Sequence, residues 1–329
     1  MLHGLATAAT AISLWFPSPS PDSIKLPNLN GDRAEVTVSG ISAGGYMALQ
    51  LLVADSTLYR GAGSIAGGPW HCAKGDSAVA QDACMANTTK IDVQNLINET
   101  KAAAAAGHLE DLSNLGRSRV YLYNSDADNV VKKPMLERVT QYVEAFVPAT
   151  QVLTQHSIPS AHGWPTLDYG NSCGTQANPW LLNCKFDMAG EMLGHLYGAL
   201  NAKTKAVKSS LKTFDQAEFD TSGDARLIAT GWVYIPKACE AKSCKVHVAL
   251  HGCQQNSDYV QDQFVQHAGL NEWAESNDMI VLYPQESMTM MSNPYACWDW
   301  WGYTGSNYAT KDGAQLKAIT AMVDRLTGH

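Results

Sequence analysis

The sequence predicts an α/β fold with a mostly parallel central sheet flanked by helices. Short segments with strand-like patterns alternate with helical patterns along the chain, which is typical of parallel sheets. A Gly-x-Ser-x-Gly motif lies between a predicted strand and a predicted helix. The chain has 329 residues and is 45% hydrophobic, so it is long enough to bury a large core as one domain or two.

The first half of the chain supplies several predicted strand and helix units. Alternating polar and apolar residues predict a strand at 35–38, and inward-facing Met47, Leu51 and Leu52 predict a helix at 43–54. The remaining predictions for this half are strands at 63–66, 119–123 and 151–155, and helices at 89–106, 134–145 and 187–200.

The second half begins after a polar stretch at 203–223, which has the composition of a linker. Beyond it the patterns predict strands at 227–235, 246–250 and 279–283, and helices at 261–276 and 314–326. The polar stretch either separates two domains or lies within one.

Charge and hydropathy exclude two classes of partner. The formal net charge is −8 and no Lys/Arg-rich run occurs, so we expect no nucleic-acid binding. Residues 5–15 are apolar and are followed by a proline-rich break at 17–21, so the N-terminal segment 1–25 is either a signal-peptide remnant or an ordered arm. No other segment approaches the ~20 apolar residues needed to span a bilayer, so we expect no membrane partner.

The cysteines indicate an oxidising compartment. There are eight, an even number, and no Cys-x-x-Cys pair indicates a zinc or dithiol site, so we expect no metal. Neighbouring cysteines could close short loops, and one more bridge could join distant loops. The alternative is a set of eight buried thiols in a reducing compartment. A disulfide framework fits better, and it predicts a secreted protein.

The motif Gly40-Ile41-Ser42-Ala43-Gly44 predicts a nucleophile. Small flanking residues permit the sharp turn between strand and helix that exposes the serine hydroxyl in α/β-hydrolases. The alternative is an ordinary tight turn with a surface serine. The position between a predicted strand and helix favours the nucleophile, Ser42.

A serine nucleophile needs a base, and the base needs an orienting carboxylate. α/β-Hydrolases place these in the order serine, acid, histidine. The loop after the strand at 119–123 offers two acids, Asp126 and Asp128. His162 lies in a small-residue loop from which a base could reach the serine, whereas His156 and His195 fall at a strand end and within a helix.

The oxyanion donors indicate a permuted chain order. The backbone N–H of Ala43, directly after the nucleophile, should be one donor. The second usually follows a His-Gly pair on an earlier strand, but here His251-Gly252-Cys253 comes after the serine. The first half of the chain contains the serine, the acids and the histidine but lacks the front strands of a hydrolase sheet, whereas the second half contains front strands and a His-Gly loop but lacks a nucleophile. We therefore expect one circularly permuted domain, residues 26–329, that brings the Cys253 N–H beside Ser42. The alternative is two independent domains.

These residues resemble a known family. The chain is similar to the single-domain, circularly permuted poly(3-hydroxybutyrate) depolymerases from about residue 26 to near its end. The segments that carry the resemblance are GISAGGYM at 40–47, AGGPWHC at 66–72, 171–173, VHVALHGC at 246–253, 271–280 and CWDWWG at 297–302.

The resemblance implies a site. It selects Asp128, three residues before Val131, over Asp126 as the acid, with Ser42 and His162 completing the triad. It further implies oxyanion donors at Ala43 and Cys253, and a Trp298 that lines the crevice for the polyester. The implied disulfides are Cys72–Cys84, Cys173–Cys184, Cys239–Cys244 and Cys253–Cys297.

The function that the resemblance implies is hydrolysis of poly(3-hydroxybutyrate) or its oligomers by a secreted monomeric enzyme without a cofactor. An aromatic and methionine-rich tract at 288–303 suits an apolar ester chain, although its members could equally be core residues. One alternative is an esterase for another bulky ester, such as an aryl, plant cell-wall or synthetic polyester substrate. Another is a non-catalytic polymer-binding protein of the same fold.

Overall fold

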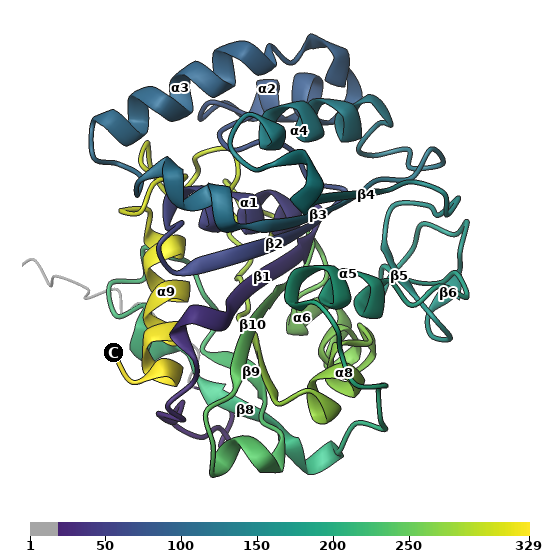
Figure 1. Cartoon of the computed structure of the whole chain (residues 1–329), viewed down its shortest axis with the longest axis vertical. Helices are drawn as coiled ribbons and strands as arrows, with labels where there is room; N and C mark the ends of the chain where they lie inside the picture. The colour runs from purple at the N-terminus through teal and green to yellow at the C-terminus, as the bar shows by residue number, and fades with distance from the viewer. Residues whose placement is uncertain (1–18) are drawn as a thin grey trace, which may run out of the picture.

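The computed structural model describes residues 19–329 and is built around a sheet of eight strands (Figure 1). The apolar segment 5–15, predicted to be a signal-peptide remnant or an arm, lies outside the described residues. In spatial order the strands are β4 (Val152–Gln155), β3 (Arg119–Tyr123), β2 (Tyr59–Ile65), β1 (Val36–Ile41), β10 (Lys245–Leu250), β11 (Met279–Tyr283), β9 (Thr230–Tyr234) and β8 (Leu211–Asp215).

Strands from both halves of the chain meet at the centre of this sheet. β1 pairs in parallel with β10, in a register that runs from Val36 opposite Val246 to Gly40 opposite Leu250. The pairing is parallel from β4 to β11, and only β9 and β8 are antiparallel. The predicted α/β-hydrolase fold with permuted strand order and a mostly parallel sheet is therefore confirmed.

The strands bury both faces of the sheet by simple alternation. In β3, Val120 and Leu122 contribute to one buried cluster and Tyr121 and Tyr123 to the other. This is the period of two that a strand imposes on its side chains. A parallel sheet needs helices on both faces, because each face carries apolar side chains.

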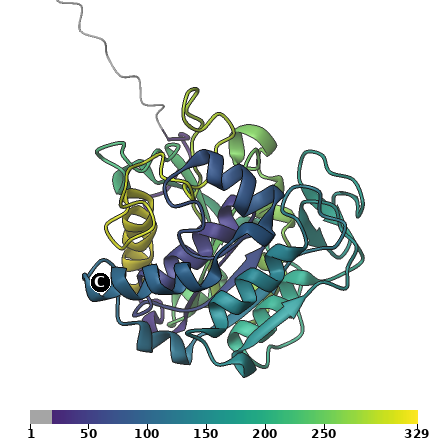
Figure 2. The same cartoon turned by 90° about the horizontal axis from the view of Figure 1, so that it is seen from above.

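Helices cover the two faces accordingly (Figures 1 and 2). Residues of α1, α3, α4 and α9 belong to one buried cluster, and residues of α5, α7 and α8 belong to the other. The helices are α1 (Ala43–Ala54), α2 (Ser77–Gln81), α3 (Val93–Ala105), α4 (Pro134–Glu144), α5 (Met188–Tyr197), α6 (Ser257–Val260), α7 (Gln263–His267), α8 (Leu270–Ser276) and α9 (Ala314–Thr327). No helix in the described part of the chain is long and apolar enough to cross a membrane.

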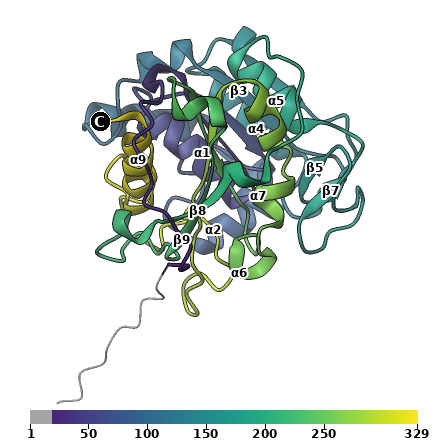
Figure 3. The ribbon, with the colours of Figure 1, turned by 90° about the horizontal axis from the view of Figure 1, so that it is seen from below.

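Three features differ from the sequence-based expectations. The polar stretch 203–223 contains β8, which is the edge strand of the main sheet. The helix predicted at 261–276 is two helices, α7 and α8, because Gly269 between them adopts a φ of +80° that ends a helix. A small second sheet is formed by β5 (Trp164–Thr166), β7 (Leu181–Asn183) and β6 (Asn171–Ser172), on the side of the molecule away from α9 (Figure 3).

Four disulfides join the chain, in the pairing that the resemblance implies. They are Cys72–Cys84, Cys173–Cys184, Cys239–Cys244 and Cys253–Cys297, and the described residues contain no free cysteine. Three close loops of 12 residues or fewer, whereas Cys253–Cys297 spans 44 residues. That bridge joins the loop after β10 to a loop that follows β11.

Candidate active site

Ser42 lies on a strained turn between β1 and α1. Its backbone has φ 54° and ψ −121°, a region that costs a non-glycine residue energy and that clusters at functional sites. The turn is tight, because a Cβ added to Gly40 would lie 2.3 Å from the carbonyl oxygen of Gly44. A Cβ on Gly44 would lie 2.5 Å from the carbonyl oxygens of Leu250 and His251. The glycines of the motif therefore allow the serine turn to pack directly against the end of β10.

The acid loop follows β3 and holds Asp128 in place. Asp128 is buried, and its Oδ1 accepts hydrogen bonds from the backbone N–H groups of Val130 (2.8 Å) and Val131 (3.0 Å). Its Oδ2 lies 2.8 Å from Nδ1 of His162. The other candidate, Asp126, is half exposed and pairs with Lys133 at 2.5 Å. The structure thus brings Asp128, and not Asp126, to the histidine.

The loop that carries His162 is tied down on both sides. The N–H of Ala161 donates to the carbonyl of Cys173, and the N–H of Trp164 donates to the carbonyl of Trp180, each at 2.8 Å. Only 8% of His162 is exposed. With Nδ1 facing the Asp128 carboxylate, the neutral ring carries its proton on Nδ1 and leaves Nε2 as a base.

Ser42 and His162 line one pocket. The residues around it are Ile41, Ser42, Met85, Val130, His162, Gly163, Gln176, Trp180, Gly252, Cys253, Gln254, Gln255 and Tyr295. Within residues 19–329 the Ser42 hydroxyl makes no hydrogen bond to His162. Such contacts are often long without substrate and shorten when it binds.

Two backbone amides are available as oxyanion donors. Ala43 is the first residue of α1, so its N–H has no partner within the helix. Cys253 follows β10 and lines the pocket that holds Ser42. Neither N–H donates to another group within the part of the chain that the structure describes. The two expected donors, Ala43 and Cys253, therefore both keep a free N–H next to the serine.

The expectation for Trp298 needs correction. Its side chain is fully buried, with its ring centroid 5.4 Å from that of His251, and it is not among the residues that line the pocket. The preceding Cys297 is bonded to Cys253 in the loop after β10, and the Trp298 ring packs beside His251 of that loop. The aromatic side chains at the pocket are those of Trp180 and Tyr295.

The sequence reasoning missed most of the apolar pocket residues. Met85 comes from a short helical turn at Asp82–Ala86, and Val130 and Trp180 come from loops without strand or helix periodicity. The sequence places Tyr295 only in the aromatic and methionine-rich tract at 288–303. A sequence signal existed for Val130, because it directly adjoins the acid loop, but none identified Trp180.

A second buried histidine lies away from the pocket. His247, in the middle of β10, has Nδ1 2.7 Å from Thr37 Oγ1 and Nε2 2.8 Å from Ser39 Oγ. Burial lowers its pKa to about 3, so the ring stays neutral. These bonds join adjacent strands of the sheet, which is a structural role. Within residues 19–329, the serine on the strained turn and a histidine paired with a buried carboxylate meet at one pocket, which Ser42 and His162 line.

The fold and the arrangement of Ser42, His162 and Asp128 define the class as α/β-hydrolase. Residues 230–328 match the family model described as "Esterase PHB depolymerase". A poly(3-hydroxybutyrate) depolymerase of Delftia acidovorans is 43% identical over 98% of this chain, and a polyhydroxybutyrate depolymerase of Talaromyces funiculosus is 33% identical over 92% of both chains. The chain belongs to the poly(3-hydroxybutyrate) depolymerase family.

Solved structures agree with this assignment. A PHB depolymerase variant complexed with an R3HB trimer superimposes with a TM-score of 0.86 at 33% identity, covering 93% of this chain and 99% of the other. The PHB depolymerase from Penicillium funiculosum gives a TM-score of 0.85 at 33% identity, with the same coverage. The chain spans 65% of the length of the Delftia relative.

Proposed function

We propose that this protein hydrolyses the ester bonds of poly(3-hydroxybutyrate) or its oligomers, with Ser42 as nucleophile. The observation that carries the proposal is the Asp128–His162 pair, which lies at the pocket containing Ser42 in a member of this family. The named activity of the relatives in Delftia and Talaromyces supports the substrate.

In the proposed reaction, Ser42 Oγ attacks the ester carbonyl while Nε2 of His162 takes its proton. Asp128 holds the ring and stabilises the positive charge that develops on it. The N–H groups of Ala43 and Cys253 bind the oxyanion. His162 then returns the proton to the leaving alcohol, an acyl-enzyme remains on Ser42, and a water activated by His162 releases the hydroxy acid.

The pocket lining suits a chain of apolar ester units. Met85, Val130, Trp180 and Tyr295 present apolar or aromatic surface beside the serine, and the described pocket contains no charged side chain apart from the catalytic histidine when it is protonated. A polyester has carbonyl acceptors but no charge, so it requires apolar contacts and a few donors. Tyr295 is 55% exposed, so it extends this surface to the exterior.

The disulfides support a proposal on the location of the enzyme, and the main sheet supports one on its domain organisation. We place the enzyme outside the cytosol, because four disulfides require an oxidising compartment. We assign residues 26–329 to one catalytic domain, since β1 and β10 pair at the centre of one sheet. We further propose that this domain acts as a monomer.

Clearing of a poly(3-hydroxybutyrate) suspension by purified protein tests the proposal, with Ser42→Ala as control and p-nitrophenyl butyrate as a second substrate. We expect the wild type to clear the suspension and to hydrolyse the ester, and the variant to do neither. Turnover of the small ester without clearing would keep the serine mechanism but overturn the polymer assignment. Full activity of Ser42→Ala would overturn both.

A further inference from the structure

In the loop after β10, two of three consecutive backbone N–H groups are hydrogen-bonded within residues 19–329, and the one between them is not. The N–H of Gly252 donates to Oε1 of Gln255 at 2.9 Å, and the N–H of Gln254 donates to the carbonyl of Tyr295 at 2.7 Å. The N–H of Cys253 lies between these two and donates to no group in residues 19–329. The loop is therefore built to keep a single donor for the pocket.

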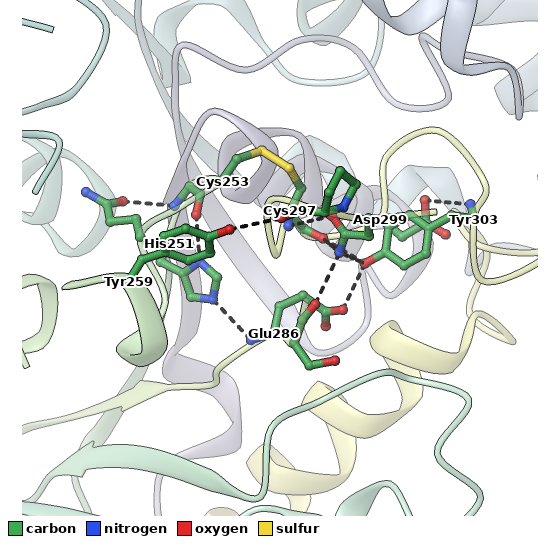
Figure 4. The surroundings of a disulfide bond; sticks show 12 residues. His251, Cys253, Tyr259, Glu286, Cys297, Asp299 and Tyr303 are labelled. Carbon is green, nitrogen blue, oxygen red and sulfur yellow. Dashed lines mark hydrogen bonds between the residues drawn. A yellow bond between two sulfur atoms is a disulfide. The ribbon is translucent and has the colours of Figure 1, made fainter. Parts of the chain in front are cut away.

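His251 holds the peptide group to which that donor belongs (Figure 4). Its ring is fully buried; Nδ1 lies 2.7 Å from the carbonyl oxygen of Gly252, and Nε2 lies 3.1 Å from the backbone nitrogen of Glu286. A carbonyl only accepts and a backbone N–H only donates, so Nδ1 carries the proton and Nε2 accepts. Burial lowers the pKa of His251 to about 4, which keeps this neutral form.

Because the peptide between Gly252 and Cys253 is trans, the contact between His251 and the Gly252 carbonyl also fixes the direction of the Cys253 N–H. The carbonyl of Gly252 and the N–H of Cys253 are in one planar unit and point in opposite directions. A bond that fixes the carbonyl toward His251 therefore fixes the N–H on the other side, where Cys253 lines the pocket with Ser42. Glycine at 252 offers little resistance to rotation of this peptide, so an external restraint is needed.

We propose that His251 is a positioning residue for the proposed hydrolysis, which aims the Cys253 N–H at the oxyanion through its hydrogen bond to Gly252. The inference rests on the proposed function, since it concerns the same site. His251 does not touch the substrate, and its effect is on the transition state, where the oxyanion forms.

The surroundings of His251 prevent the ring from turning. The Trp298 ring packs against it, and the carbonyl of Glu286 accepts from Asn256 Nδ2 at 2.7 Å. On the far side of the loop, Cys253 is bonded to Cys297, whose N–H and carbonyl are both bound by the side chain of Asn293. The free donor is thus held from both sides, by a ring and by a disulfide.

Two substitutions separate positioning from packing. The amide of asparagine reaches about as far from the backbone as Nδ1, so His251→Asn retains a donor for Gly252 and loses the contact with Glu286. The amide of glutamine reaches about as far as Nε2, so His251→Gln retains an acceptor for the N–H of Glu286 and loses the contact with Gly252. His247→Gln, in β10 four residues before His251, is the matched control for removing a buried histidine.

The assay is hydrolysis of p-nitrophenyl butyrate together with inhibition by butaneboronic acid, whose serine adduct places an oxygen where the oxyanion forms. We expect kcat of His251→Gln to fall about 10- to 100-fold at little-changed KM, less than the ~10²–10³ lost when a donor is removed. Its Ki for the boronic acid should rise in parallel. His251→Asn and His247→Gln should stay within about threefold of wild type in both, because each retains the oriented donor.

Equal losses of kcat in the Asn and Gln variants, or a Ki that does not rise in His251→Gln, would overturn the positioning role. Melting temperatures of all variants report whether a loss reflects unfolding, and His251→Asn keeps the test valid if His251→Gln unfolds. Ser42→Ala is measured in parallel. If Ser42→Ala retains activity, the proposed function itself fails. If Ser42→Ala is inactive and the losses of kcat in His251→Asn and His251→Gln are equal, only the role of His251 is refuted.

Discussion

Replacing Asp128 by asparagine should abolish most of the activity while leaving the fold intact. The Asn side-chain oxygen can still accept from the N–H groups of Val130 and Val131, so the acid loop keeps its shape. The amide nitrogen would then face Nδ1 of His162, and two donors cannot share that 2.8 Å contact. His162 would have to move its proton to Nε2, the nitrogen that must accept from Ser42. By analogy with the serine-protease triad, kcat/KM should fall about 10⁴-fold.

The assay is kcat/KM for p-nitrophenyl butyrate near pH 8, with a melting curve for each variant. Asp126→Asn is the matched control, since Asp126 is half exposed and its pair with Lys133 is worth at most about 1 kcal/mol. We expect this control to keep near-normal activity and stability. The reasoning would be refuted if Asp128→Asn kept more than about a tenth of the activity, or if Asp126→Asn lost as much.

Alanine at position 128 should also lower the free energy of unfolding, unlike asparagine. Asp128→Ala leaves the amides of Val130 and Val131 without an acceptor, and each buried unsatisfied amide costs about 1–3 kcal/mol. Denaturant unfolding should therefore show a lower free energy of unfolding for Asp128→Ala than for Asp128→Asn. Equal stabilities would show that the two amide bonds do not hold the loop.

Two further predictions concern the rest of the molecule. Because burial lowers the pKa of His247 to about 3, the unfolded chain binds a proton below pH 6.5 that the folded chain excludes, so stability falls as pH falls from about 6.5 toward 3, by ~1.4 kcal/mol per pH unit. His247→Gln should lower the slope of the unfolding free energy against pH between pH 6.5 and 4.5 by this amount and leave the slope that His251 contributes, and an unchanged slope in urea unfolding would contradict this. Removing the Cys253–Cys297 bridge, which spans 44 residues, should cost roughly 4 kcal/mol and lower kcat, whereas removing Cys239–Cys244, which spans 5, should cost roughly 2 kcal/mol and leave kcat unchanged. Melting curves and ester turnover of the two double Cys→Ala variants check both, and equal kcat values would contradict the role of the longer bridge.

Much of the fold could be read from the sequence where a pattern was both local and buried. The predictions of a helix at 43–54 and of strands at 119–123 and 279–283 match α1, β3 and β11 within their bounds. These segments are buried nearly throughout, so their apolar residues are continuous or alternate clearly. β8 gave a weak signal, because in this edge strand only Phe214 is fully buried.

The site could be predicted where a motif constrains the backbone, and not where long-range packing decides. Ser42 and His162 follow from a strained turn and a small-residue loop, and these lie at the same pocket. Whether Trp298 or Trp180 faces that pocket depends on the disulfide at Cys297 and on the small second sheet. Neither constraint is visible in local sequence, so the choice of tryptophan required the structure.

The central pair of strands also affects how the enzyme is made. Thr37 on β1 and His247 on β10 are hydrogen-bonded neighbours although 210 residues separate them. A chain emerging from a ribosome or a translocation pore presents the serine early and its oxyanion partner late, so the nascent enzyme has no complete site until the second half has been delivered. Contacts of such long range also slow folding. The site therefore cannot be complete before the second half of the chain has been synthesised and β10 has paired with β1.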